Sequence, residues 1–279
     1  MRRLIVDAGS TKTEWVVMED NRIVDRLVLG GYNPNYSADN ALTDMLRQAW
    51  ASVTPEIDAI HYYGSGCGLE ANKMLVSKQL TKCFPKAMIE VETDMIGAAR
   101  ALFGQQKGIA CILGTGVNSC LYDGSAIVDH AVSLGYLVGD EGSGCDIGKR
   151  VVRAYFYNLM PLELKLSFEH DYKLNINDFI QHVYHEKEAS KYLAGFAKFA
   201  GEHQDDPFIR QLIRERFGEF ADAFLLRYEG VRHIPVGIVG SVAYHFHAIL
   251  KETLEAEGLS SIRVLQSPSE GLVSYYSNR

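Results

Sequence analysis

The sequence lacks a paired cysteine motif, an excess of basic residues and any long apolar run. Its five cysteines are an odd number without Cys-x-x-Cys spacing, and most of them sit in apolar stretches, which indicates reduced thiols and a cytosolic compartment. A formal net charge of −7 leaves no general basic field, whereas duplex-binding proteins gain affinity by neutralising phosphates. These absences argue against a nucleic-acid partner and favour a small molecule.

The amino-terminal end carries no recognisable targeting segment. Met1, Arg2 and Arg3 precede the apolar run 4–6, which ends at Asp7 and is too brief for a signal-peptide core or a membrane span. A cytoplasmic protein without a membrane partner is therefore expected. The chain is also long, because 279 residues with 47% hydrophobic content exceed a typical single domain and predict two.

The same three-stranded arrangement is predicted twice, about a hundred residues apart. The first copy reads RLIVD, GSTKTEWVVMED and NRIVDRLVLG, and the second reads IACILG, TGVNSCLYD and GSAIVDHAVSLG. In each copy a Gly/Ser/Thr loop joins the first two strands, and a short Asp-containing turn joins the next two. Two copies at this separation indicate duplicated domains, since the repeats of a solenoid are shorter.

Apolar and helical patterns elsewhere complete two α/β halves. Four further runs are apolar enough to form buried parallel strands: 57–63, 87–91, 234–239 and 262–265. Helical periodicity marks 38–53, 70–83, 145–159, 244–257 and the region 162–228, and the segment 161–171 fits either a helix or a loop. Each half is therefore predicted to hold a mixed five-stranded sheet flanked by helices.

The first Gly/Ser/Thr loop, residues 7–13, has the composition of a phosphate-binding hairpin. It joins two strands, whereas Walker and Rossmann loops lead into helices. A glycine lets the backbone approach phosphate oxygens, hydroxyls donate hydrogen bonds and a lysine adds positive charge. The residues expected at the phosphates are Gly9, Ser10, Thr11, Lys12 and Thr13, and Asp7 is expected to hold Mg²⁺ through water. Taken alone, the loop could also be an ordinary turn.

A second loop and a later strand end extend the nucleotide hypothesis. Gly114, Thr115 and Gly116 again lie between two strands and repeat the phosphate-loop pattern. Farther on, the strand 234–239 ends in Gly240 and Ser241 and runs into the helix 244–257. With Ser241 as its cap, a helix start offers free N–H groups to a polar or anionic group, although a simple strand-to-helix connection has the same sequence.

Asp94 is the candidate catalytic base. It follows the strand 87–91, and ligands of open α/β sheets gather at the carboxyl ends of strands. Phosphoryl transfer needs a carboxylate that accepts the proton of the attacking hydroxyl and orients this group toward the γ-phosphorus. The alternative role for Asp94 is to cap the helix predicted at 95–103.

These motifs resemble the N-acetylglucosamine kinases of the BadF/BadG/BcrA/BcrD-type ATPase family, within the actin, heat-shock-protein and hexokinase superfamily. The matching segments, in family order, are DAGSTKTEW at 7–15, GYNPN at 31–35, ETDMIGAA at 92–99, LGTGVNS at 113–119, LGYLVGDEGSG at 134–144 and VGSVA at 239–243. The resemblance implies an α/β fold of two actin/ribonuclease H-like domains with a nucleotide cleft between them. Residues 1–105, rejoined by a helix at 268–279, would form the first domain, and residues 106–267, with a helical insertion around 160–230, the second.

The resemblance also implies an activity. The reaction would be the ATP-dependent phosphorylation of an amino sugar, N-acetylglucosamine at its 6-hydroxyl before others, with ATP and Mg²⁺ as cofactors. Asp94 would be the base. Thr11, Thr115, Gly201, Gly240 and Ser241 would contact ATP, and Asn33, Asn118, Gly135 and Asp140 would contact the sugar. Carboxylates and amides in Gly-rich segments suit the recognition of vicinal hydroxyls.

The sequence departs from the family pattern at Leu134, where vertebrate-type enzymes carry a tryptophan. Glucosamine and N-acetylmuramic acid therefore stay open as acceptors beside N-acetylglucosamine. An activase of the iron–sulfur type is a further alternative, but its ligand pattern is not evident around Cys111, Cys120 or Cys145. A non-catalytic sugar or ATP sensor is disfavoured by the presence of Asp94 with both loops. The expected partners are an amino sugar and ATP, and a homodimer is the default assembly.

Overall fold

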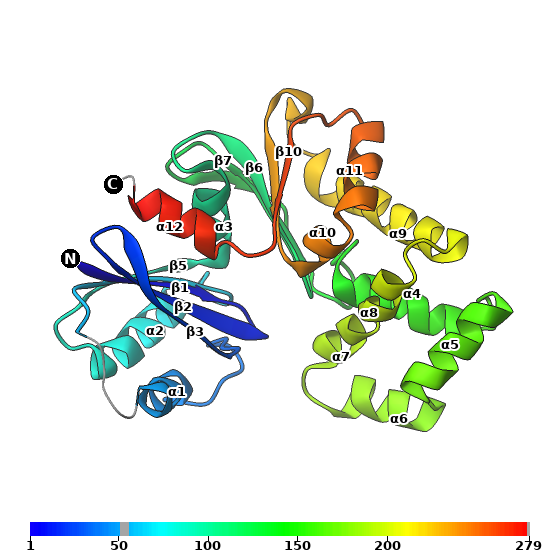
Figure 1. Cartoon of the computed structure of the whole chain (residues 1–279), viewed down its shortest axis with the longest axis horizontal. Helices are drawn as coiled ribbons and strands as arrows, with labels where there is room; N and C mark the ends of the chain where they lie inside the picture. Colours follow the sequence, from blue (N-terminus) through cyan, green and yellow to red (C-terminus); the bar gives the residue numbers. More distant parts are fainter. Residues whose placement is uncertain (51–55, 278–279) are drawn as a thin grey trace. The chain divides into compact units, whose positions relative to one another are not determined.

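The computed structural model describes residues 1–50 and 56–277, and the chain divides into two compact units (Figure 1). Unit 1 consists of Met1–Gln106, Gly124–Ala126 and the segment that begins at Ser267. Unit 2 consists of Lys107–Asp123 and Ile127–Gln266. In the described part of the chain, no helix is long and apolar enough to cross a membrane.

Unit 1 is built on a five-stranded mixed sheet. Its strands are β1 (Arg2–Ala8), β2 (Lys12–Glu19), β3 (Arg22–Gly30), β4 (Ala59–Gly64) and β5 (Met88–Thr93), in the order β3-β2-β1-β4-β5. The first three strands form the predicted antiparallel meander, and β4 and β5 run parallel to β1. The strand prediction is confirmed, except that β5 is an edge strand with no fully buried residue.

Helices cover the sheet of unit 1. They are α1 (Ala41–Ala49), α2 (Glu70–Cys83), α3 (Asp94–Phe103) and α12 (Ser269–Ser277). Side chains alternate along β1, so that Leu4 and Val6 enter the core formed with α1 and α2, while Ile5 enters the core formed with α3 and α12. Part of the helix predicted at 38–53 lies outside the described residues, as do the last two residues of the one predicted at 268–279.

Polar side chains fix α12 to unit 1. The hydroxyls of Tyr276 and Tyr63 lie 2.5 Å apart, and Arg100 Nη1 of α3 donates to Tyr63 Oη at 2.7 Å and to Glu90 Oε1 at 2.9 Å. Burial and the neighbouring Glu90 charge raise the pKa of Tyr276, so its hydroxyl stays protonated and available as a hydrogen-bond donor. The carboxyl-terminal helix thereby becomes an integral part of the first sheet's covering layer.

Unit 2 repeats the strand order of unit 1. Its strands are β6 (Gly108–Leu113), β7 (Val117–Tyr122), β8 (Ile127–His130), β9 (Val236–Val239) and β10 (Ile262–Leu265), in the order β10-β9-β6-β7-β8. Both meanders even change register between their second and third strands, at Val17/Met18 in unit 1 and at Leu121/Tyr122 in unit 2. The repeat seen in the sequence is therefore a repeat of topology.

The helices of unit 2 surround its sheet and form the predicted helical region. They are α4 (Gly144–Phe156), α5 (Leu162–Tyr172), α6 (Ile176–Ile180), α7 (Ala189–Gly195), α8 (Ala197–Glu202), α9 (Pro207–Phe220), α10 (Ser241–His245) and α11 (His247–Ala256), with short helical turns η1 (Gln181–His185), η2 (Ala221–Leu225) and η3 (Val231–His233). The ambiguous segment 161–171 is helical, because Leu164 and Phe168 of α5 pack into the core of unit 2.

Candidate functional site

The first hairpin loop connects β1 and β2 through residues 9–11. It is closed by a hydrogen bond from Gly9 N to Lys12 O at 3.0 Å, and Ser10, Thr11 and Lys12 are exposed. Thr13 is fully buried: its hydroxyl donates to Gly30 O at 3.2 Å and accepts from Trp15 Nε1 at 2.8 Å. The predicted phosphate contact of Thr13 is therefore wrong, because its buried hydroxyl already makes hydrogen bonds within the protein.

Two carboxyl groups with raised pKa values lie near the ends of β1 and β5. Burial, together with the charges of Asp94 and Glu14, raises the pKa of Asp7 to about 7, and the charge of Lys12 opposes this rise. Burial likewise raises the pKa of Asp94 to about 6, against a hydrogen bond from Met95 N at 2.9 Å. Both groups therefore change charge near neutral pH, where a kinase base has to work.

The helix-capping role considered for Asp94 belongs to its neighbour. Thr93 is the cap residue of α3, and its hydroxyl accepts a hydrogen bond from Ile96 N at 3.3 Å. Asp94 is the first residue of the helix, and its carboxyl accepts from Met95 N of its own first turn. Within the described residues, the second carboxylate oxygen of Asp94 takes no part in the helix start and can accept a hydrogen bond from a hydroxyl.

Asn33 is held beside the first loop by a network of short polar side chains. Its Nδ2 donates to Ser10 Oγ at 3.2 Å, and its Oδ1 accepts from Asn35 N at 3.0 Å. Asn72 Nδ2 of α2 donates to Asn35 Oδ1 at 2.8 Å and to Gly66 O at 2.7 Å. The predicted phosphate residue Ser10 and the predicted sugar residue Asn33 are thus brought into direct contact.

The sequence analysis missed the loop that completes this network. Ser65 Oγ lies 3.1 Å from Ser10 Oγ, and a Cβ atom on Gly66 would lie 2.3 Å from Asn33 Oδ1, where φ is +80°. A signal was available, since GSGCG directly follows the strand predicted at 57–63. The nearby Cys67 is fully buried, and burial followed by the Asp94 charge raises the pKa of its thiol to about 12, so it stays protonated and unreactive.

The second hairpin loop, residues 114–116 between β6 and β7, is tied to the start of α4. Gly114 N donates to Gly116 O at 3.0 Å, while Gly144 N donates to Gly114 O at 2.8 Å and Cys145 N donates to Thr115 O at 3.1 Å. These bonds use the first amides of α4 to fix the loop's carbonyls. The predicted phosphate loop and the Gly-rich segment 139–144 therefore form one structure.

Asp140 lies against this loop. Its side chain is 7% exposed, Val117 N donates to Asp140 Oδ1 at 3.4 Å, and a Cβ on Gly116 would lie 3.0 Å from Asp140 Oδ2. Burial raises the pKa of Asp140. In the same segment, Gly139 N donates to Gly135 O at 2.9 Å, and Leu134 is 61% exposed. On β7, Asn118 Oδ1 accepts from Ser119 N at 2.9 Å.

A buried ion pair, which sequence reasoning missed, supports the segment that carries Asp140. Asp146 Oδ2 accepts from Gly142 N at 3.0 Å and lies 3.8 Å from Arg216 Nη1, and both side chains are less than a tenth exposed. Arg216 also donates to both carboxylate oxygens of Glu219, at 2.5 and 2.8 Å. Removing one partner of such a pair leaves an uncompensated buried charge, so this contact fixes the segment's conformation.

The Gly240–Ser241 connection differs from its prediction in two respects. Gly240, with φ +139°, is the residue before α10, and Ser241 makes no capping hydrogen bond, so the predicted cap is wrong. A Cβ on Gly240 would lie 2.3 Å from Leu113 O, so only glycine lets this strand end pack beside the second loop. The single helix predicted at 244–257 is two helices, α10 and α11, which are divided at the buried Phe246.

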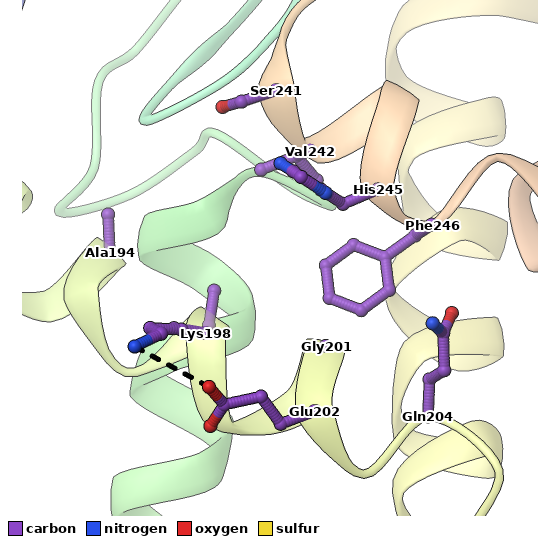
Figure 2. Close-up of a pocket in the computed structure, with 10 residues that line it drawn as sticks. Ala194, Lys198, Gly201, Glu202, Gln204, Ser241, Val242, His245 and Phe246 are labelled. Carbon is purple, nitrogen blue, oxygen red and sulfur yellow. Dashed lines mark ion pairs between the residues drawn. The ribbon is translucent and has the colours of Figure 1, made fainter.

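A pocket of about 560 Å³ opens between α8 and α10 in unit 2 (Figure 2). Gly201 and Ser241, forty residues apart in sequence, both line it. Gly201 was predicted in a break between helices, but it lies in the last turn of α8, and the break follows at His203. The lining residues are Ala194, Ala197, Lys198, Gly201, Glu202, Gln204, Ser241, Val242, His245 and Phe246.

The donor set near Asp94 suits a hard cation that is shared with phosphates. Residues 1–50 and 56–277 contain no group of three or more His, Cys, Asp or Glu side chains placed to hold a metal ion. Asp7 and Asp94 are close enough for their charges to repel, and a cation between them would relieve this repulsion. Mg²⁺ is commonly bound by one or two carboxylates with water and substrate phosphates, so these residues fit that ion.

Comparisons with known proteins agree with the repeated fold. Residues 6–205 match the BadF/BadG/BcrA/BcrD ATPase family. The chain belongs to this family. A solved structure of a proposed N-acetylglucosamine kinase from Porphyromonas gingivalis is 37% identical, covers 99% of each chain and superposes with a TM-score of 0.91. Family membership supports ATP as the nucleotide.

More distant solved structures share the fold alone. A proposed N-acetylglucosamine kinase from Chromobacterium violaceum is 19% identical, with a TM-score of 0.75 and 98% of each chain covered. A ROK hexokinase from Thermus thermophilus is 14% identical, with a TM-score of 0.50 over 99% of this chain and 98% of the other. The predicted fold class of two mixed five-stranded sheets flanked by helices, of the actin-like ATPase kind, is confirmed.

The Gly66 contact predicts a selective effect on acceptor binding. In Gly66→Ala, the new Cβ displaces Asn33 or strains the backbone, so the KM for the acceptor should rise at least about tenfold, since small misplacements of positioning groups are costly. Steady-state kinetics with each substrate varied in turn measure this effect. Gly68→Ala is the matched control, because a Cβ there meets nothing within 4 Å. Equal acceptor KM values in the two variants would contradict the role given to this contact.

The raised pKa of Asp7 predicts a pH-dependent gain of stability in Asp7→Asn. Because the folded-state pKa lies near 7 and the reference value is 3.8, the wild type loses stability as pH rises through this interval. Without nucleotide or Mg²⁺, the variant should be more stable than the wild type at pH 8 by about 1–2 kcal/mol after allowance for solvent screening, and by less at pH 5. Thermal unfolding at both pH values measures the difference.

Asp20→Asn is the control for this comparison, since the Asp20 side chain is 84% exposed at the turn between β2 and β3. A gain in Asp7→Asn that is the same at pH 5 and pH 8, or that the control reproduces, would show that the Asp7 carboxylate carries no such penalty.

Proposed function

We propose that the protein transfers the γ-phosphoryl group of ATP to an amino sugar, with the 6-hydroxyl of N-acetylglucosamine as the first candidate acceptor. The observation that carries this proposal is the state of Asp94, a half-buried carboxyl at the end of β5 whose pKa is raised to about 6 and whose capping duty belongs to Thr93. The 37% identity to a proposed N-acetylglucosamine kinase supports the choice of acceptor.

Unit 1 supplies the base and the metal ligand. Asp94 accepts the proton of the attacking hydroxyl, and Asp7 holds Mg²⁺ through water. When bound, this ion neutralises charge on the phosphates. Ser10, Thr11 and Lys12, which are exposed at the first loop, contact the phosphates, and Asn33 binds a sugar hydroxyl next to Ser10.

Unit 2 supplies the second phosphate loop, the nucleoside site and further sugar contacts. Gly114, Thr115 and Gly116 contact the phosphates from a loop whose carbonyls are held by α4. Asp140 accepts hydrogen bonds from the sugar, together with Asn118 and Gly135. The adenosine lies in the pocket that Gly201 and Ser241 share, near Gly240.

Glucosamine and N-acetylmuramic acid are the alternative acceptors. Leu134, at the place of the tryptophan of vertebrate-type enzymes, is 61% exposed and presents no aromatic face to a sugar. The reaction belongs in the cytoplasm, since all five cysteines are free, four of them fully buried, and a reducing compartment keeps thiols in that state.

Asp94→Asn tests the proposed chemistry. The variant keeps the size of the side chain but loses the base, so kcat should fall by roughly a hundredfold or more with little change in ATP affinity. The wild-type kcat/KM should rise with pH through about 6–7, where Asp94 and Asp7 lose their protons. Because the two carboxyl groups interact, each of the two deprotonation steps belongs to the pair and not to one residue. ADP release, measured over a range of pH values with N-acetylglucosamine, glucosamine and N-acetylmuramic acid, gives both kcat and kcat/KM.

Asp44→Asn, an exposed carboxyl on α1, is the control for the loss of one negative charge in unit 1. Near-full activity of Asp94→Asn would remove Asp94 from the mechanism. ATP binding by the wild type without turnover of any sugar would overturn the kinase proposal and favour the sensor.

A further inference from the structure

The pocket of unit 2 is lined by small and apolar residues on two sides. Figure 2 shows Ala194 and Gly201 on one side, from α7 and α8, and Val242 and Phe246 on the other. The two sides come close together at Gly201, where a Cβ would lie 3.6 Å from Phe246 Cζ, in van der Waals contact, so a ligand would lie beside this contact and not between the two residues. Its volume of about 560 Å³ falls within the usual range of about 300–1,000 Å³ for ligand pockets.

One polar side chain of the lining differs from the others in its surroundings. Lys198, Glu202, Ser241 and His245 are exposed, whereas Gln204 is partly buried. Lys198 and Glu202 are also paired with each other, at 3.4 Å on the surface, and such pairs contribute little energy. A hydrogen bond that is shielded from water discriminates better between ligands than an exposed one.

The carboxamide of Gln204 has unused hydrogen-bonding capacity. It follows α8 directly, after His203, and within residues 1–50 and 56–277 it makes no hydrogen bond with another protein group. A carboxamide presents an acceptor and a donor side by side. Because Gln204 belongs to the lining of the pocket, this pair of atoms can hydrogen-bond to the edge of a heterocyclic base bound there.

We propose that Gln204 selects adenine over guanine nucleotides by pairing with the 6-amino group and N7 of the base. Adenine places a donor beside an acceptor on this edge, and the Gln204 carbonyl and NH₂ groups complement them. Guanine places two acceptors there, O6 and N7, so the Gln204 carbonyl would face O6 without a hydrogen bond. The inference rests on the proposed ATP-dependent function and adds to it the residue that determines base specificity.

Nucleotide binding without any sugar tests this role. Titration calorimetry with ATP, GTP and 7-deaza-ATP, which lacks N7, is run on the wild type, Gln204→Leu and Gln204→Glu. The wild type should prefer ATP to both other nucleotides by about tenfold or more, the scale of one discriminating base contact. Gln204→Leu should bind ATP at least about tenfold more weakly and GTP unchanged, so that the preference disappears.

Gln204→Glu keeps the acceptor but loses the donor to N7, so it should bind ATP and 7-deaza-ATP alike. Gln211→Leu is the matched control, because Gln211 lies on the surface of α9, bonded to Glu215 Oε1 at 2.9 Å. ATP binding with an unchanged ATP-to-GTP ratio in Gln204→Leu, or wild-type indifference to N7, would overturn this inference alone. Absence of adenine-nucleotide binding by the wild type would overturn the proposed function with it.

Discussion

The parallel pairing of β1, β4 and β5 is the constraint on which the candidate site of unit 1 depends. Because the carboxyl ends of parallel strands meet at one edge of a sheet, Asp7 from β1, Gly66 after β4 and Asp94 after β5 are gathered there from distant parts of the sequence. In unit 2, β6 and β9 repeat the arrangement, and Gly240 approaches the carbonyl of Leu113 so closely that no other residue fits.

This arrangement has an energetic cost that the proposed function explains. Asp7 and Asp94 repel each other at partly buried positions, so the folded protein is less stable above neutral pH than it would be with neutral side chains. Cation and phosphate binding would remove the repulsion, and stability would then be gained when the substrates bind. Charge repulsion of this kind is common at catalytic sites, and it does not itself stabilise the fold.

Local patterns were sufficient to predict most of the fold from the sequence. The alternating and continuous apolar runs placed the strands, and the likeness of the two meanders revealed the repeat. Details that depend on tertiary packing were not predictable. Thr13 is buried, and its hydroxyl is hydrogen-bonded to Gly30 O and Trp15 Nε1. Phe246 is also buried, and the helix predicted at 244–257 is divided there into two.

The same limit explains which site residues were missed. Gly66 and Asn72 act through Asn33 by contacts between separate elements, and Gln204 lies in a helical region whose periodicity carries no sign of the pocket it faces. By contrast, Asp94 was found because its chemistry depends on a local feature, the end of a strand. Its release from capping by Thr93 became visible with the structure alone.

The most direct test of the central claim is to identify the phosphorylated product. Wild-type protein is mixed with MgATP and N-acetylglucosamine and followed by ³¹P NMR. The account predicts that a sugar phosphomonoester forms in the same amount as ADP. Formation of ADP with orthophosphate alone, with no phosphomonoester from this sugar, glucosamine or N-acetylmuramic acid, would contradict it.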